Sequence, residues 1–86
     1  MPGNLRNLRR QIDETDRRIV RLLSRRAALA ARIGREKRRT GLPLRDFARE
    51  AEVLRRVRRL GRGPLRGKAL AAVYRRIIAV CAELEK

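Results

Sequence analysis

Apolar residues recur every three or four positions along most of this chain, which is the spacing of one face of an α-helix. In the first forty residues they are Leu5, Leu8, Ile12, Ile19, Leu22, Leu29 and Ile33. No proline interrupts the chain between Pro2 and Pro43. The residues at 40–43, Thr-Gly-Leu-Pro, are typical of a helix end followed by a turn. The pattern therefore predicts one long helix over about residues 5–39.

Two shorter helices follow. Asp46 is a residue type that caps helix N-termini, and the apolar run after it ends at the Gly-Arg-Gly-Pro turn of residues 61–64. A third apolar stripe is formed by Leu70, Val73, Ile77, Val80 and Leu84. No strand pattern or repeat competes with these helices. The prediction is one all-α domain, residues 1–86, with helices over about residues 5–39, 46–60 and 65–85.

The length of the first helix predicts a dimer. At ~1.5 Å per residue it would span about 50 Å, whereas a compact domain of this size has a radius of gyration near ~12 Å. The two shorter helices cannot cover its whole apolar side. A second copy of the same helix is the simplest cover, so we expect a symmetric homodimer.

The composition excludes some classes of site and favours others. The 86 residues include 25 Lys and Arg, 9 Asp and Glu and no His, which gives a formal net charge of +16. This charge favours anionic ligands. The single cysteine excludes an internal disulfide and, without histidine, a conventional zinc site. Only two residues are aromatic, which is few for a protein that stacks on single-stranded nucleic acid.

One stripe of the first helix carries two cations. Arg26 interrupts an apolar row, where a charge is costly unless it is paired. Lys37 lies eleven residues further on and only about 20° round the helix, so both can face one cavity. Arg9 lies ~25 Å from Arg26 along the axis and can reach that cavity only from an antiparallel partner. An anionic guest between the cations is one reading, and a buried salt bridge of Arg26 is the other.

Further candidates lie on the other two helices. Asp46, Arg49 and Glu50 share one face at the start of the second helix, either as ligand-binding groups or as a cap with local ion pairs. Cys81 and Glu85 are four residues apart in the third helix. The negative pole of a helix C-terminus favours the protonated form of a carboxyl group such as that of Glu85. Alternatively, Glu85 is a frayed surface residue.

Four segments carry a family resemblance: LRRQIDETD at 8–16, LLSRRAALA at 22–30, GREK at 34–37 and DFARE at 46–50. Together they resemble the all-helical chorismate mutase family, with a match that extends from Leu5 to Glu85. The resemblance is specific because several charged residues occur together at the spacing of the family: Arg9, Asp16, Arg26, Lys37, Asp46, Arg49 and Glu50.

The resemblance implies a three-helix protomer in an intertwined antiparallel homodimer, with an arginine donated across subunits to each active site. It also implies an isomerase of aromatic amino acid (Phe and Tyr) biosynthesis, which converts chorismate to prephenate by a 3,3-sigmatropic (Claisen) rearrangement. This reaction needs no metal and no cofactor. The family includes fusions with, and partners of, other shikimate-pathway enzymes, so such an association is expected here too.

The resemblance also implies a role for each site residue. Arg26 and the Arg9 of a second subunit would bind the substrate carboxylates, and Lys37 would donate to the ether oxygen. Glu50 would accept a hydrogen bond from the ring hydroxyl, helped by backbone near Asp46. Arg49 would orient Glu50.

Two positions depart from the usual family pattern. Cys81 stands where a small hydroxyl residue is common, which implies a weaker hydrogen bond to a substrate carboxylate. Glu85 stands where many members have Gln as a second donor to the ether oxygen. Because an ionised carboxylate would repel the developing charge, the resemblance implies that Glu85 acts as a protonated acid.

Three other functions stay open at this stage: an isochorismate pyruvate-lyase on the same scaffold, a basic helical nucleic-acid-binding protein, and a helical dimerisation module. Neither a signal peptide nor an apolar stretch long enough to span a membrane is evident, so the cytoplasm is the expected compartment and no membrane partner is expected.

Overall fold

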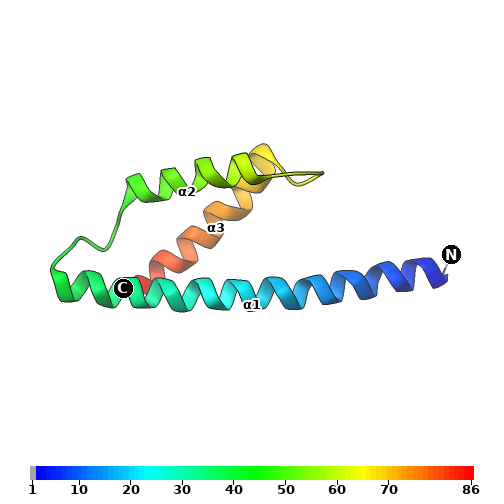
Figure 1. Ribbon diagram of the computed structural model, residues 1–86, viewed down its shortest axis with the longest axis horizontal. Coiled ribbons are helices and arrows are strands. Elements are labelled where there is room, and N and C mark those ends of the chain that lie inside the picture. Colours follow the sequence, from blue (N-terminus) through cyan, green and yellow to red (C-terminus); the bar gives the residue numbers. More distant parts are fainter. Residues whose placement is uncertain (1) are drawn as a thin grey trace.

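The computed structural model describes residues 2–86 and consists of three helices: α1 (Pro2–Thr40), α2 (Phe47–Leu60) and α3 (Gly67–Glu85) (Figure 1). The predicted all-α, three-helix architecture is confirmed. Helix α1 begins three residues earlier than predicted, because Gly3 and Asn4 are helical but carry no apolar signal. Helix α3 begins two residues later than predicted, after a turn in which Gly63 adopts a φ of 67°.

Helix α1 sets the shape of the molecule. The chain extends 58 Å in its longest direction and has a radius of gyration of 16.4 Å, well above the ~12 Å of a compact domain of this length. Figure 1 shows the N-terminal half of α1 running past the other helices with nothing beside it. The overhang expected from the helix length is therefore present.

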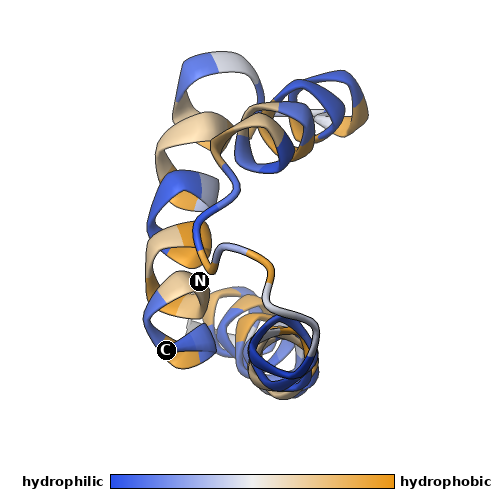
Figure 2. Ribbon diagram, turned by 90° about the vertical axis from the view of Figure 1, so that its left-hand side faces the viewer, coloured by the Kyte–Doolittle hydropathy of each residue, from blue (hydrophilic) through white to orange (hydrophobic). Residues whose placement is uncertain are grey.

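Helix α3 holds the other two helices together. It packs against α1 and against α2, whereas α1 and α2 do not come within 8 Å of each other at their Cα atoms. The side chains that become buried are small or medium-sized and come from all three helices: Ala30, Val57, Ala71, Ile78 and Cys81. Hydrophobic residues lie along all three helices, as Figure 2 shows.

Most large apolar residues remain exposed in the single chain. On α1 they include Leu5, Leu8, Ile12, Ile19, Leu22, Leu29 and Ile33, which are the residues of the predicted stripe. Exposed apolar residues over such a length are unusual on a monomer and are typical of a surface that another helix covers. Among residues 2–86, no helix is long and apolar enough to cross a membrane.

The connection between α1 and α2 is fixed at both ends. Gly41 takes a φ of 73°, a conformation that favours glycine, and ends α1. At the other end, the Asp46 carboxylate accepts a hydrogen bond of 3.0 Å from the backbone N–H of Arg49, so the expected capping role of Asp46 is confirmed. This cap fixes the point at which α2 begins.

Candidate active site

One cavity of about 430 Å³ opens between the C-terminal part of α1, the start of α2 and the last turns of α3. Seven of the eight residues predicted for the site line it: Arg26, Lys37, Asp46, Arg49, Glu50, Cys81 and Glu85. Apolar side chains such as Leu29, Ile33 and Val53 complete the wall. The cavity is therefore an apolar pocket with a few charged groups that converge on it, which is typical of a small-molecule site.

Lys37 and Glu85 form the best-shielded ion pair of the site. The Lys37 Nζ lies 2.7 Å from Glu85 Oε1, and the side chains are only 17% and 18% exposed. The same ammonium group donates a second hydrogen bond of 2.7 Å to the main-chain oxygen of Leu44, in the α1–α2 connection. Lys37 thus joins the end of α3 to the loop that precedes α2, and two of its three donors are used.

A glycine allows α1 and the end of α3 to meet. A β-carbon at Gly34 would lie 2.2 Å from the main-chain oxygen of Glu85 and 2.6 Å from its Cα, which is closer than any side chain tolerates. Glu85 can therefore occupy this position only because residue 34 has no side chain. The position of the Glu85 carboxyl group therefore depends on this backbone contact as well as on the ion pair with Lys37.

Glu50 is held by an arginine that the sequence analysis did not select. Arg45 donates two hydrogen bonds to the Glu50 carboxylate, at 2.8 Å from Nε and 2.9 Å from Nη2. These bonds raise the pKa of the Arg45 guanidinium above its ordinary value. Arg45 also stacks on the ring of Phe47, 4.6 Å from its centroid, which fixes the plane of the guanidinium.

The resemblance implies that Arg49 orients Glu50, but the structure shows no contact between these two side chains. Arg49 pairs with Glu52, which also accepts a hydrogen bond of 3.0 Å from Arg56. Arg49 and Glu52 are three residues apart on α2, which brings their side chains together on the helix surface. Arg45 precedes the helix cap, so helical periodicity gave no signal that it would reach back to Glu50.

Arg26 has no carboxylate partner in residues 2–86. Its guanidinium carbon lies 5.6 Å from the centroid of the Tyr74 ring of α3, within the range of a cation–π interaction. The side chain is partly buried and lines the cavity. The buried salt bridge that was the alternative reading of Arg26 is therefore not formed, and the cation stays available to an anion in the cavity.

Cys81 is buried, with 6% of its surface exposed, and also lines the cavity. It belongs to the packed face of α3 as much as to the site. No group of three or more His, Cys, Asp or Glu side chains among residues 2–86 is arranged to hold a metal ion.

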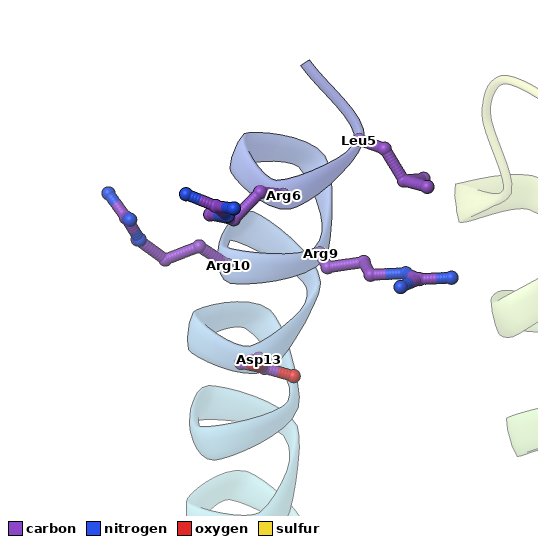
Figure 3. Close-up of a pocket in the computed structure, with 5 residues that line it drawn as sticks. All are labelled: Leu5, Arg6, Arg9, Arg10 and Asp13. Carbon is purple, nitrogen blue, oxygen red and sulfur yellow. The ribbon is translucent and has the colours of Figure 1, made fainter. Parts of the chain in front are cut away.

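Arg9 is the one predicted site residue that lies elsewhere. It lines a second hollow of about 450 Å³ at the free end of α1, with Leu5, Arg6, Arg10 and Asp13. In Figure 3, Leu5 and Arg9 point from one side of the helix, and Arg6 and Arg10 point from the other. A single chain therefore does not bring Arg9 to the cavity that the other seven residues share.

The fold and the cavity together define a class: an all-helical protein with a small, largely apolar site whose free charged groups suit an anionic guest. The family model of chorismate mutase type II matches residues 8–86, and the chain belongs to this family. The family resemblance found in the sequence is confirmed.

Individual relatives agree with this assignment. The chain is 42% identical over 86 residues to a "Bifunctional chorismate mutase/prephenate dehydratase" of Aquifex aeolicus, a match that covers 95% of this chain and 24% of the relative. It is 36% identical over 60 residues to a "Chorismate mutase" of Methanocaldococcus jannaschii, covering 70% of this chain and 61% of the relative. The chain thus spans about a quarter of the length of the bifunctional relative.

A solved structure shares the fold over nearly its whole length. It is a conserved hypothetical protein from Pyrococcus furiosus, which superposes with a TM-score of 0.81 at 31% sequence identity. The match covers 96% of each chain. The long α1 with two shorter helices folded back beside it is therefore an arrangement that this relative shares.

Proposed function

We propose that this chain is a chorismate mutase, which converts chorismate to prephenate. Family membership and the cavity between the three helices support the proposal. The single observation that carries it is the convergence of Arg26, Lys37 and Glu85, from two helices, on one cavity. Helical spacing on α1 alone cannot bring Glu85 to the two cations.

The reaction requires the protein only to position the substrate and to stabilise the charge that develops on it. One ether C–O bond breaks while one C–C bond forms in the same molecule, so no nucleophile or proton transfer to carbon is needed. The protein must hold a flexible dicarboxylate in its reactive diaxial form and stabilise negative charge that grows on the ether oxygen. Fixed cations in a shielded cavity meet both requirements.

Lys37 is the donor to the ether oxygen in this proposal. Its Nζ already stands at the wall of the cavity, held by the main-chain oxygen of Leu44. The third donor of the ammonium group is free for the substrate, and the bond to Leu44 limits how far the side chain can move. A donor that is held in place before the reaction is typically worth ~3–4 kcal/mol of the barrier.

Glu85 changes partner when substrate binds. In the free protein its carboxylate neutralises Lys37 at 2.7 Å. A dianionic substrate beside Lys37 would repel that carboxylate, and the family pattern implies that Glu85 acts in its protonated form. In this form the carboxyl group donates a second hydrogen bond to the ether oxygen.

The hydroxyl side of the substrate faces α2. Glu50 accepts the hydroxyl hydrogen bond in this proposal, because Arg45 holds its carboxylate from outside and leaves it at the wall of the cavity. Asp46 cannot turn freely, since its side chain caps α2. Cys81 and Arg49 also line the cavity.

The second carboxylate requires a second chain. Arg26 is the only free arginine that the cavity receives from α1, and Arg9 lies ~25 Å further along that helix. The exposed apolar stripe of α1 supports an antiparallel homodimer in which the Arg9 of one subunit enters the cavity of the other. The dimer would bury the stripe and complete the site at the same time.

The bifunctional relatives support a wider role. Their names combine the mutase with prephenate dehydratase, the activity that consumes prephenate. We propose that this chain acts in aromatic amino acid biosynthesis, joined to or associated with another enzyme of that route. The cytoplasmic location expected from the sequence belongs to the same proposal.

A direct assay tests the activity. The purified protein is incubated with chorismate, and the loss of chorismate and the appearance of prephenate are followed, with Lys37→Ala as the control. We expect prephenate from the wild type and almost none from the variant. Turnover of isochorismate in a parallel assay, with chorismate left intact, would contradict the proposal and favour the lyase.

A further inference from the structure

A second cation of α1 holds the end of α3 from outside the cavity. Arg38 follows Lys37 in the chain but does not line the cavity. Its Nη1 donates hydrogen bonds to the main-chain oxygens of Glu85, at 2.7 Å, and Lys86, at 3.0 Å. Glu85 is the last residue of α3 and Lys86 is its C-cap, and backbone carbonyls at a helix end lack partners within the helix.

Helix α3 itself has no cation at this place, and the lysine that follows it, Lys86, pairs with Glu83 at 3.1 Å. The last turn of α3, up to Glu85, contains no basic residue, although positive charge there is what stabilises the negative pole of a helix. Arg38 supplies the charge from the neighbouring helix. Gly34, one helical turn before Arg38 on the same face of α1, lets the two backbones approach closely enough for these bonds.

Glu85 is therefore held twice, by different residues. Lys37 binds its carboxylate and Arg38 binds its backbone. In the proposed mechanism Glu85 turns from Lys37 to the ether oxygen of the substrate, so the first of these contacts is lost when the site is loaded. The contact with Arg38 does not involve the cavity and can persist.

We infer that Arg38 is a positioning residue for the mutase reaction: it keeps the end of α3, and with it the Glu85 carboxyl group, in place while Lys37 is engaged by substrate. The inference rests on the proposed function. It assigns no contact between Arg38 and substrate. The effect of Arg38 on the rate must therefore pass through Glu85.

The test compares Arg38→Met with Arg35→Met, because both remove one positive charge from the same stretch of α1. Arg35 is exposed and makes no hydrogen bond or ion pair within residues 2–86. We expect Arg38→Met to lower kcat about tenfold or more, since a misplacement of ~1 Å can cost up to ~10²-fold. KM should change by less than about threefold, because ground-state contacts remain. Arg35→Met should stay within about twofold of wild type.

Two further variants separate positioning from general stability. Arg38→Lys keeps a charged donor and should recover a large part of kcat. In a Glu85→Ala background, Arg38→Met should change kcat by less than about twofold, because the group that Arg38 positions is already absent. An equal loss of kcat in both backgrounds would overturn the inference, as would a kcat for Arg38→Met equal to that of Arg35→Met.

Circular dichroism and thermal melting check that each variant is folded. If Arg38→Met does not fold, Arg38→Gln, which keeps one amide donor, takes its place in the two backgrounds with the same expected and contradicting results. Wild-type turnover of chorismate distinguishes a failure of the proposed function from a failure of the role inferred for Arg38. An inactive wild type contradicts the proposed function, whereas an active wild type with an unaffected Arg38 variant contradicts only this inference.

Discussion

The proposed chemistry depends most on one pair of residues, Lys37 and Glu85, which are 48 positions apart in sequence and 2.7 Å apart in the structure. With less than a fifth of each side chain exposed, their charges are poorly screened by solvent. The pair stabilises the free protein only modestly, because removing both charges from water offsets much of their attraction. In the proposed mechanism both residues act as donors to one oxygen atom of the substrate.

Replacing Lys37 with Met tests the first donor. Methionine retains most of the volume and removes the charge, so the cavity should keep its shape. We predict a fall in kcat of about 10²–10³-fold, which is the cost of losing one preorganised donor. Steady-state kinetics with chorismate measure it. Lys68→Met, an exposed lysine at the start of α3, is the matched control and should behave as wild type.

Replacing Glu85 with Gln tests the second donor. Wild-type activity should decline as pH rises and Glu85 loses its proton, because the ionised carboxylate then faces the developing negative charge. Glutamine donates at every pH, so the Glu85→Gln variant should show a much flatter decline. The profile of kcat against pH measures both. Identical profiles for the two proteins would show that Glu85 does not act as an acid.

At the scale of the helices, α3 positions the site because it contacts both neighbours. Its last turn meets α1 at Gly34, its middle supplies Ala71 and Ile78 to the core, and its Tyr74 ring lies against Arg26. Helix α2, in contrast, meets α1 only through the cavity and the connecting loop. The geometry of the site therefore depends on how closely α3 approaches α1.

Substituting alanine for Gly34 tests that approach. Alanine favours a helix over glycine by ~1 kcal/mol, but the new β-carbon would meet the Glu85 backbone at 2.2 Å. Overpacking of this kind typically costs ~1–3 kcal/mol. We predict a lower Tm and reduced activity for Gly34→Ala, measured by thermal melting and chorismate turnover.

Gly3→Ala is the matched control, since a β-carbon at Gly3 has no atom within 4 Å. Its Tm should be equal to or above that of wild type. If Gly34→Ala also melts at or above the wild-type temperature with full activity, the close contact between α1 and α3 is not a feature of the folded protein.

Helical periodicity was enough to predict the three helices, the cap at Asp46 and the shared stripe of Arg26 and Lys37, because each depends on residues close in sequence. The helical spacing of apolar residues does not predict which residues of different helices contact each other. Arg38 binds the backbone of a residue 47 positions away, and Arg45 reaches Glu50 from outside the helix. Neither contact changes the spacing of apolar residues, so both could be identified only from the three-dimensional structure.

At the scale of the whole molecule, a single chain is incomplete in two ways. The apolar stripe of α1 is exposed, and the arginine hollow around Arg9 lies at the far end of a molecule 58 Å long. One antiparallel partner would remove both deficits, because it covers the stripe and carries its own Arg9 to the cavity. The account therefore predicts that neither catalysis nor full stability belongs to the monomer.

Complementation between two inactive variants tests this sharing of one site most directly. Arg9→Ala and Lys37→Ala are each expected to be folded dimers with almost no activity. When the two variants are mixed one to one and refolded together, half of the dimers contain one chain of each. Each mixed dimer has one intact site and one site that lacks both residues. Activity should therefore return to about a quarter of wild type. A mixture no more active than the separate variants would contradict the account, because Arg9 and Lys37 would then not meet across two chains.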